Sequence, residues 1–317
     1  MTNNFRLNVL QIGCAIFALC AASFCQPASA NGDHLSALSS KVSLLTKSTL
    51  VQGEPIILQY SVFNISDRKI VLDWAGAEGY SLALMDQVGN TVAIEQKQAP
   101  KEGYYLMLDP VMRSGGKYET CIAVPQHNVR LRPGRYTLMV RVRLPYTTTD
   151  SNEENPLKIE SEITASGNIY SRVFRIPLTV TAPNDGALRA TAASLLKTLS
   201  AKPYGPEYIA DVDALFSMPE AQAAPSWQKL LAHPGSSMNI ALIIDKLGDV
   251  KSVKSADMLL KMLDSPTLSS DNSMFVSRKL EETYNSGDFK VRSHLKNTMA
   301  QRGITLPDRI AVSQPTD

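Results

Sequence analysis

The spacing of apolar residues changes once along this 317-residue chain, close to residue 183. Before that point, short runs alternate between apolar and polar residues and are separated by turn-forming residues, which is typical of half-buried β-strands. After it, apolar residues recur every three or four positions, which is typical of amphipathic helices. The sequence therefore predicts two domains in series, an all-β domain over residues 36–183 and an α-helical domain over 187–302.

The first domain combines many short strands, regular turns and no helical pattern, which predicts an antiparallel β-sandwich. Its turns at 64–67 (Asn-Ile-Ser-Asp) and 86–90 contain residues whose side chains bond to nearby backbone. The predicted strands cover residues 42–45, 55–64, 69–74, 80–85, 91–95, 117–124, 130–144, 157–163 and 170–181.

One of these strands contains five arginines: Arg130, Arg132, Arg135, Arg141 and Arg143. Alternation gives it an apolar face, made of Tyr136, Leu138, Val140, Val142 and Leu144, and an opposite face with the last three arginines. The arginines are either a binding face for an anionic partner or the solvent-exposed face of a half-buried strand.

The next predicted strand, 157–163, also alternates and places Glu160 and Glu162 on one face. If it pairs with the arginine-rich strand, these glutamates can lie opposite Arg141 and Arg143, where each cross-strand pair contributes about 0.2–1 kcal/mol. Because such neighbours neutralise the charge locally, we favour the exposed-face interpretation.

Two stretches of the first domain resemble a known family. Residues 53–67 (GEPIILQYSVFNISD) resemble the second strand and turn of bacterial extracytoplasmic immunoglobulin-like domains. Residues 131–142 (LRPGRYTLMVRV) resemble a late strand of the same domains, where L-x-P-G-x-Y recurs. The resemblance covers about residues 36–183 and implies an immunoglobulin-like β-sandwich without the cysteine pair of antibody domains. It implies no catalytic residues, because this architecture serves many functions.

The second domain contains seven predicted helices, each with an apolar stripe: 187–200, 207–218, 226–233, 239–247, 253–263, 272–284 and 290–299. The residues that follow the last helix, 303–317, are predicted to be a disordered tail.

A loose internal repeat relates L-G-D-V-K-S-V-K-S-A, from residue 247, to S-G-D-F-K-V-R-S-H-L, from residue 286. Its glycines, Gly248 and Gly287, lie 39 residues apart (287 − 248), close to the roughly 40-residue period of HEAT and armadillo units. Residues 205–302 therefore resemble a short HEAT-like array, with a Gly-Asp turn and an Asp N-cap in each unit. A plain helical bundle is the alternative that stays open.

Residues 1–30 have the three parts of a secretory signal peptide: a basic residue, Arg6, an apolar run, and small residues that end at Ala30. Cleavage between Ala30 and Asn31 is predicted, with export by the Sec route to the periplasm or the medium. The apolar run is shorter than the roughly 20 residues that span a bilayer, which disfavours an uncleaved anchor. No later stretch is long and apolar enough to span a membrane.

Removal of this segment changes both the charge and the cysteine content. The formal charge falls from +2 to about +1, which disfavours nucleic acid as a partner. Three of the four cysteines leave, and the remaining Cys121 has no partner for a disulfide within the chain.

No motif defines a reaction, a cofactor or a metal site. The four histidines, His34, His127, His233 and His294, form no HExxH or other paired ligand spacing, and no glycine-rich phosphate loop is present. Ser-x-x-Lys occurs at Ser194/Lys197 and Ser226/Lys229 without a Lys-Thr-Gly partner, as expected of chance matches. We therefore predict no catalytic, cofactor-binding or metal-binding residue, and partner-binding residues stay undefined.

Three local features allow a functional and a structural interpretation, and the structural one is favoured in each case. Cys121 with His127 is either a catalytic dyad or, as favoured, a small apolar strand residue, with an intermolecular disulfide as a minor alternative. Residues 150–155 are a calcium-binding loop or a solvated acidic loop. Trp74 and Tyr80 form a sugar platform or pack in the core.

These observations favour an exported, non-enzymatic protein that binds another protein or a peptide of the cell envelope. Two alternatives stay open: an enzyme or enzyme accessory that acts on envelope glycans or peptides, with a site at the domain junction, and a protease inhibitor. The oligomeric state is left open by the sequence.

Overall fold

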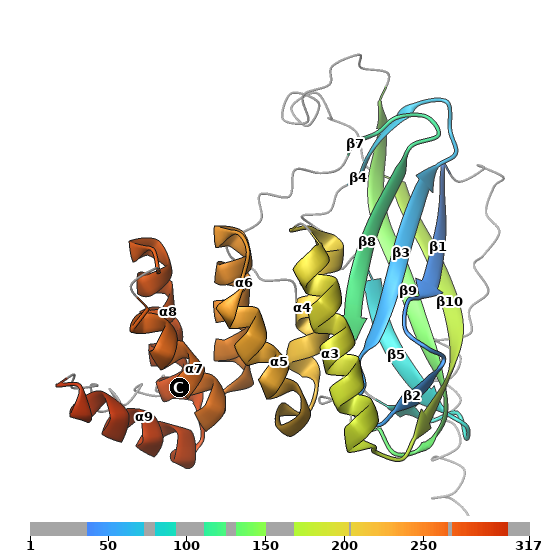
Figure 1. The fold of residues 1–317 in the computed structure, drawn as a ribbon. Coiled ribbons are helices and arrows are strands. Elements are labelled where there is room, and N and C mark those ends of the chain that lie inside the picture. Colours follow the sequence, from blue (N-terminus) through green and yellow to red (C-terminus); the bar gives the residue numbers. More distant parts are fainter. Residues whose placement is uncertain are drawn as a thin grey trace, which may run out of the picture. The chain divides into compact units, whose positions relative to one another are not determined.

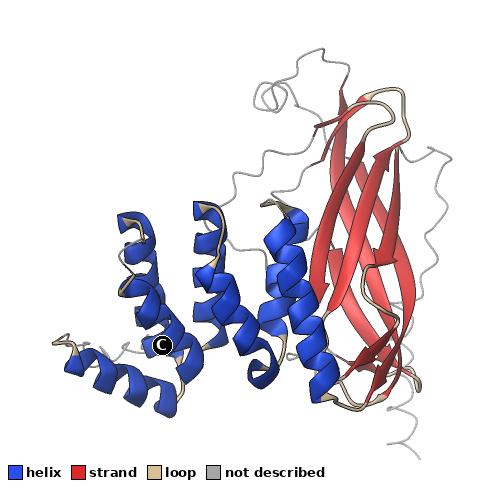
Figure 2. Ribbon diagram, in the orientation of Figure 1, coloured by secondary structure: helices blue, strands red, loops and turns tan. Residues whose placement is uncertain are grey.

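The structure is a computed structural model, and it describes residues 37–72, 80–92, 111–124, 131–149, 168–202, 204–265 and 268–303. Contacts divide the chain into two units, Met1–Ala37 and Leu38–Asp317. The second unit holds all the elements described below. Strands occupy its first part and helices its second (Figures 1 and 2), which confirms the predicted change of fold class. Ala30 and Asn31 lie outside the described residues.

The strands form two sheets. The smaller sheet has the order β1-β3-β8, with β1 at Leu38–Leu44, β3 at Ile56–Asn64 and β8 at Lys117–Val124. The larger sheet has the order β2-β10-β9-β4-β7, and β5 pairs with β9 and β6 with β5. Its strands are β2 (Thr49–Val51), β4 (Lys69–Leu72), β5 (Tyr80–Asp86), β6 (Thr91–Val92), β7 (Val111–Met112), β9 (Gly134–Thr149) and β10 (Asn168–Thr181). The described strand pairs are antiparallel except for β2 and β10, which are parallel.

The predicted alternation of β9 is confirmed. Leu138, Val140, Val142 and Leu144 are fully buried, whereas Arg135, Arg141 and Arg143 are exposed. Both cross-strand positions beside Arg141 are filled by described residues, Val173 of β10 and Ser81 of β5. Glu160 and Glu162 lie outside the described residues, as does the whole predicted strand 157–163.

The predicted turn at 64–67 is built on the side chain of Asn64. Its amide group donates to the carbonyl oxygens of Arg68, at 2.7 Å, and of Met112 and Arg113, both at 3.0 Å. Its oxygen accepts from the backbone N–H of Ser66. One buried side chain thus ties the end of β3 to β7, a two-residue strand that the sequence pattern did not predict.

The helical part contains seven helices in the described residues. They are α3 (Asp185–Ala201), α4 (Pro206–Ser217), α5 (Glu220–Ala232), α6 (Ser237–Val250), α7 (Val253–Leu263), α8 (Ser270–Ser286) and α9 (Phe289–Gln301). α5 begins six residues before its predicted start and runs through Pro225. The proline removes a single backbone bond near the helix start, and the burial of Ala223 and Ala224 holds that turn in place.

The Gly-Asp repeat holds at one of its two places. Asp288 caps α9 by accepting from the backbone N–H of Val291, as predicted. Gly248, in contrast, lies inside α6, and Ser252 caps α7. A Cβ atom at Gly248 would lie 2.9 Å from Cδ of Lys279 on α8, so this glycine allows close packing of two helices rather than a turn.

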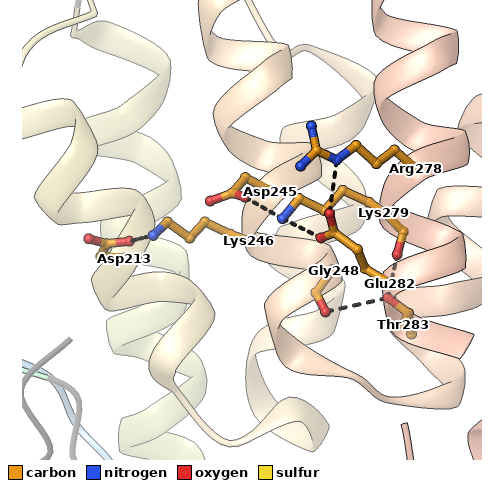
Figure 3. Close-up of polar contacts among 8 residues, drawn as sticks. All are labelled: Asp213, Asp245, Lys246, Gly248, Arg278, Lys279, Glu282 and Thr283. Atoms are coloured by element: carbon orange, nitrogen blue, oxygen red, sulfur yellow. Dashed lines mark hydrogen bonds and ion pairs between the residues drawn. The ribbon is translucent and has the colours of Figure 1, made fainter. Parts of the chain in front are cut away.

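Partly buried ion pairs link alternate helices (Figure 3). Lys246 on α6 reaches Asp213 on α4 at 2.6 Å, and Lys279 on α8 reaches Asp245 on α6 at 2.7 Å. Burial disfavours the charge on Lys246, but Asp213 outweighs it and raises the pKa of Lys246 above its ordinary value. The contact between α6 and α8 also includes a hydrogen bond of 3.4 Å from Oγ1 of Thr283 to the carbonyl oxygen of Gly248.

The sheets and the helices share a continuous core. Ile57, on the outer face of β3, is buried in the cluster that fills the helical part, and α4 packs against β8 and β3. In the turn before β3, the buried carboxylate of Glu54 accepts from Oγ1 of Thr191 on α3 at 2.5 Å and from the backbone N–H of Val51 at 2.8 Å. These contacts fix the first helices against the smaller sheet.

Candidate binding site at the junction of sheet and helices

A cavity of about 280 Å³ opens where the outer face of the smaller sheet meets the start of α4, in the region where β8 and α4 lie side by side in Figure 1. We call it the junction groove. Its lining residues come from β3 and β8 on one side and from the α3–α4 connection on the other: Gln59, Glu119, Thr120, Cys121, Lys202, Tyr204, Gly205, Pro206, Glu207 and Tyr208.

Strand register decides which side chains face the groove. Gln59 pairs with Cys121. Their side chains lie on the same face of the smaller sheet as that of Ile57, which packs on the helices. Tyr60 and Ile122, one residue further along each strand, are instead buried on the face between the two sheets. The groove therefore lies at the margin of the area that α4 covers.

Lys202 joins two carboxylates at the wall of the groove. Its Nζ lies 3.0 Å from Oε2 of Glu207 and 3.0 Å from Oδ2 of Asp211. Burial disfavours the charge on Lys202, but the hydrogen bonds to Glu207 and Asp211 outweigh it and raise the pKa of Lys202. Burial raises the pKa of Asp211, which Lys202 opposes. The lysine is therefore protonated at neutral pH and its charge is committed to this network.

Glu119 supplies a further carboxylate from β8. Its Oε1 pairs with Lys117 and accepts from Oγ of Ser61 at 2.8 Å, and these two bonds hold the pKa of Glu119 below its ordinary value. Among the described residues, Glu119, Glu207 and Asp211 pair with two ammonium groups, those of Lys117 and Lys202. The described residues therefore leave one excess negative charge at the groove.

The thiol of Cys121 is half-buried, and its pKa is raised to about 11, first by burial and then by Glu207. At pH 7 roughly one thiol in ten thousand is then ionised, so it is a poor nucleophile. His127, its predicted dyad partner, lies outside the described residues.

Two tyrosines line the groove beside these charges. The rings of Tyr204 and Tyr208 lie 6.2 Å apart with a tilt of 38°. Tyr208 is 1% exposed, and its hydroxyl has no hydrogen-bond partner among the described residues. Burial raises the pKa of Tyr208 to about 12, so the hydroxyl is protonated. A buried hydroxyl without a partner is costly, and a ligand that supplied one would recover that cost.

The other residues singled out in the sequence do not gather at the groove. Ser194 and Lys197 are exposed on α3, and Ser226 is buried in α5. On α9, His294 places its Nε2 2.7 Å from Oδ1 of Asp257. In the ranges that the structure describes, no group of three His, Cys, Asp or Glu side chains suits a metal ion.

Of the remaining predicted features, Trp74 and the acidic loop at 150–155 lie outside the described residues, whereas Tyr80 is half-buried on β5. Its pKa is raised by burial and then by the charge of Asp213.

The sequence predicted none of the groove residues as a site. They come from three separate stretches: the pairing of β3 with β8 places Gln59 opposite Cys121, and the packing of α4 on β8 adds Glu207. The one local sign is residues 204–208 (Tyr-Gly-Pro-Glu-Tyr), in which Pro206 at the first turn of α4 marks a helix start flanked by tyrosines.

A second charged surface is the arginine face, made of Arg135, Arg141, Arg143 and Arg175 on the outer face of the larger sheet. The cross-strand partners in the register are uncharged: Thr179, Val173, Ser171 and Met139 on one side, and Ser81 opposite Arg141 on the other. Exposed Ile169 and Val173 lie on the same face.

No helix of the described part is long and apolar enough to cross a membrane. Comparison with protein-family models finds no match. Comparison with curated proteins finds no match either.

Among solved structures, the chain is similar to AggA, the major subunit of aggregative adherence fimbriae type I from Escherichia coli, with 16% identity and a TM-score of 0.25 over 45% of this chain and 95% of that one. It is also similar to a PapD-like domain of human CEP192, with 9% identity and a TM-score of 0.24 over 50% of this chain and 99% of that one. A β-glucosidase from Listeria innocua matches at 14% identity and a TM-score of 0.20 over 46% of this chain, which spans only 16% of the glucosidase. At these scores the similarities carry no argument about function.

Proposed function

We propose that this chain is an exported, non-enzymatic binding protein of the cell envelope that holds a segment of a partner protein in the junction groove. One observation carries the proposal. The groove joins hydrogen-bonding and aromatic side chains from the sheet and the helical part, among them Gln59, Tyr204 and Tyr208, while its charges are largely paired with each other. A concave site with a few convergent polar groups is the usual form of a recognition site.

The rigidity of the junction supports binding. Ile57 is embedded in the helical core, and Glu54 joins the turn before β3 to α3. Because both walls are fixed to one core, a ligand would not have to order them, and less of the binding free energy is lost.

The helical part supplies a second surface, and we interpret α4–α9 as three HEAT-like helix pairs. α4, α6 and α8 begin 31 (237 − 206) and 33 (270 − 237) residues apart, and equivalent Lys–Asp pairs join each to the next. This period is shorter than the roughly 40 residues of HEAT units. Stacked helix pairs present extended surfaces to partners, and here the smaller sheet covers the first pair at α4.

Catalysis at the groove is the competing hypothesis. It would need a group that gains or donates a proton, or attacks a substrate, near neutral pH. Cys121 has a pKa of about 11, and Lys202 is held in two ion pairs. Cys121 and Lys202 are therefore better suited to binding a ligand than to catalysis.

The test uses the mature protein, residues 31–317, to capture partners from envelope extract. Gln59→Tyr fills the groove from its floor. Ser43→Tyr is the matched control, because Ser43 pairs with Gln59 on β1 and is also half-buried but lies outside the groove lining. We expect the first variant to lose a partner that the parent protein and the second variant retain. Equal recovery by both variants, with unchanged circular dichroism, would contradict the proposal.

A further inference from the structure

We propose that the junction groove accepts a cationic side chain of the partner, a lysine or an arginine, between Glu119 on β8 and Glu207 on α4. This inference rests on the proposed function and names the chemistry of its ligand.

The first argument is the set of unused acceptors. Glu119 uses Oε1 for its bonds to Ser61 and Lys117, and Glu207 uses Oε2 for Lys202. Among the described residues, the second carboxylate oxygen of each has no hydrogen-bond partner. The two residues line the groove from different elements, Glu119 from the sheet and Glu207 from the helix. A guanidinium or ammonium group has several N–H donors and can bond to both at once.

The second argument is the excess negative charge. Among the described residues, three carboxylates and two ammonium groups leave one negative charge, which a single cation neutralises. An anionic ligand would meet repulsion here.

The third argument is the aromatic wall of the groove. Tyr204 and Tyr208 line it, and a cation near such rings gains attraction from their π-systems. The hydroxyl of Tyr208 is buried without a hydrogen-bond partner among the described residues, and an N–H donor that reached it on binding would satisfy it. The volume of about 280 Å³ lies just below the range of small-molecule sites, roughly 300–1,000 Å³, and suits one long side chain.

The probes are N-acetyl-arginine methylamide and N-acetyl-citrulline methylamide, which have nearly the same shape and differ in charge. Binding to the mature protein is followed by two-dimensional NMR titration. We expect the arginine probe to shift the backbone signals of residues 119–121 and 204–208, and the citrulline probe to bind about tenfold more weakly. Equal binding of the two probes would overturn the proposal.

Variants locate the site. Glu207 is 56% exposed, so Glu207→Gln should fold normally. We expect it to weaken the arginine probe about tenfold. Glu281→Gln, at an exposed glutamate on α8, is the matched control and should bind like the parent protein. Equal affinities for both variants would refute the assignment of the carboxylate.

These results separate the inference from the proposed function. If Gln59→Tyr loses the envelope partner but the arginine probe fails to bind, the cation assignment is wrong and the groove still binds the partner. If the probe binds through Glu207 while Gln59→Tyr retains the partner, the cation site stands and the proposed function fails.

Discussion

The replacement Lys279→Met tests whether the partly buried ion pairs between helices hold the helical part together. Lys279 is 14% exposed and lies 2.7 Å from Oδ1 of Asp245 and 3.0 Å from Oε2 of Glu282. Its aliphatic stem packs against Gly248, where a Cβ atom would lie 2.9 Å from Cδ of Lys279. Methionine keeps most of this stem packing and removes the charge.

The expected loss lies between two limits. An exposed ion pair contributes about 0.2–1 kcal/mol, and removing one partner of a buried pair costs about 3–5 kcal/mol. Lys279 is mostly covered, but Asp245 and Glu282 are 38% and 44% exposed and would regain water once the lysine is gone. We therefore expect Lys279→Met to lower the free energy of unfolding by about 1–2 kcal/mol.

Urea unfolding, followed by circular dichroism at 222 nm, measures this difference. The matched control is Arg278→Met, which removes the neighbouring cation from the same Glu282 at an exposed position. It should cost at most about 0.5 kcal/mol. The reasoning is wrong if the two variants lose the same stability, or if Lys279→Met loses none.

The pH dependence of the same difference has a definite sign. Burial lowers the pKa of Lys279, but Asp245 and Glu282 outweigh it, so the pKa in the folded state lies above the ordinary 10.5. The stabilisation that the charged lysine contributes is therefore lost as pH rises through its folded-state pKa. Burial raises the pKa of Glu282, but Lys279 and Arg278 outweigh it, so its folded pKa lies below 4.5 and the stability is lost as pH falls through that value. The difference in free energy of unfolding between the parent protein and Lys279→Met should therefore be largest between the pKa of Glu282 and the pKa of Lys279.

Three other predictions concern a cysteine, a pair of arginines and a pair of glycines. The rate at which iodoacetamide alkylates Cys121 should rise with pH along a titration curve whose midpoint is near 11. A midpoint near 8.5 would contradict the burial of the thiol. Arg141→Ala with Arg143→Ala should leave the fold and partner capture unchanged, and loss of capture by a folded double variant would make the arginine face a binding surface. Gly287→Ala should lower the melting temperature more than Gly248→Ala, because its Cβ would lie 2.6 Å from the backbone oxygen of Thr283 rather than near a movable lysine stem.

Local pattern was sufficient for features that depend on one element at a time. Alternation predicted both faces of β9, and helical spacing predicted the buried stripe of α3, Leu188, Ala192, Leu195 and Leu199. Both succeed because a half-buried element imposes its own period on the sequence.

Features that depend on contacts between distant residues escaped prediction. Gly248-Asp249 and Gly287-Asp288 look alike in the sequence, but α8 packs against the first pair and makes it helical. The very short strands β2 and β7 contain too few residues to show a period. The groove arises only when α4 covers part of β8, so neither Glu119 nor Glu207 stands out in the sequence as a site residue.

The central claim, that the junction groove holds a partner, is tested most directly by photo-crosslinking in envelope extract. The mature protein would carry a benzophenone amino acid in place of Gln59 in one sample and in place of Ser43, its partner in the β1–β3 register, in another. We expect a discrete adduct with one envelope protein from position 59, reduced by excess N-acetyl-arginine methylamide, and no such adduct from position 43. The same adduct from both positions, or none from position 59, would contradict the claim.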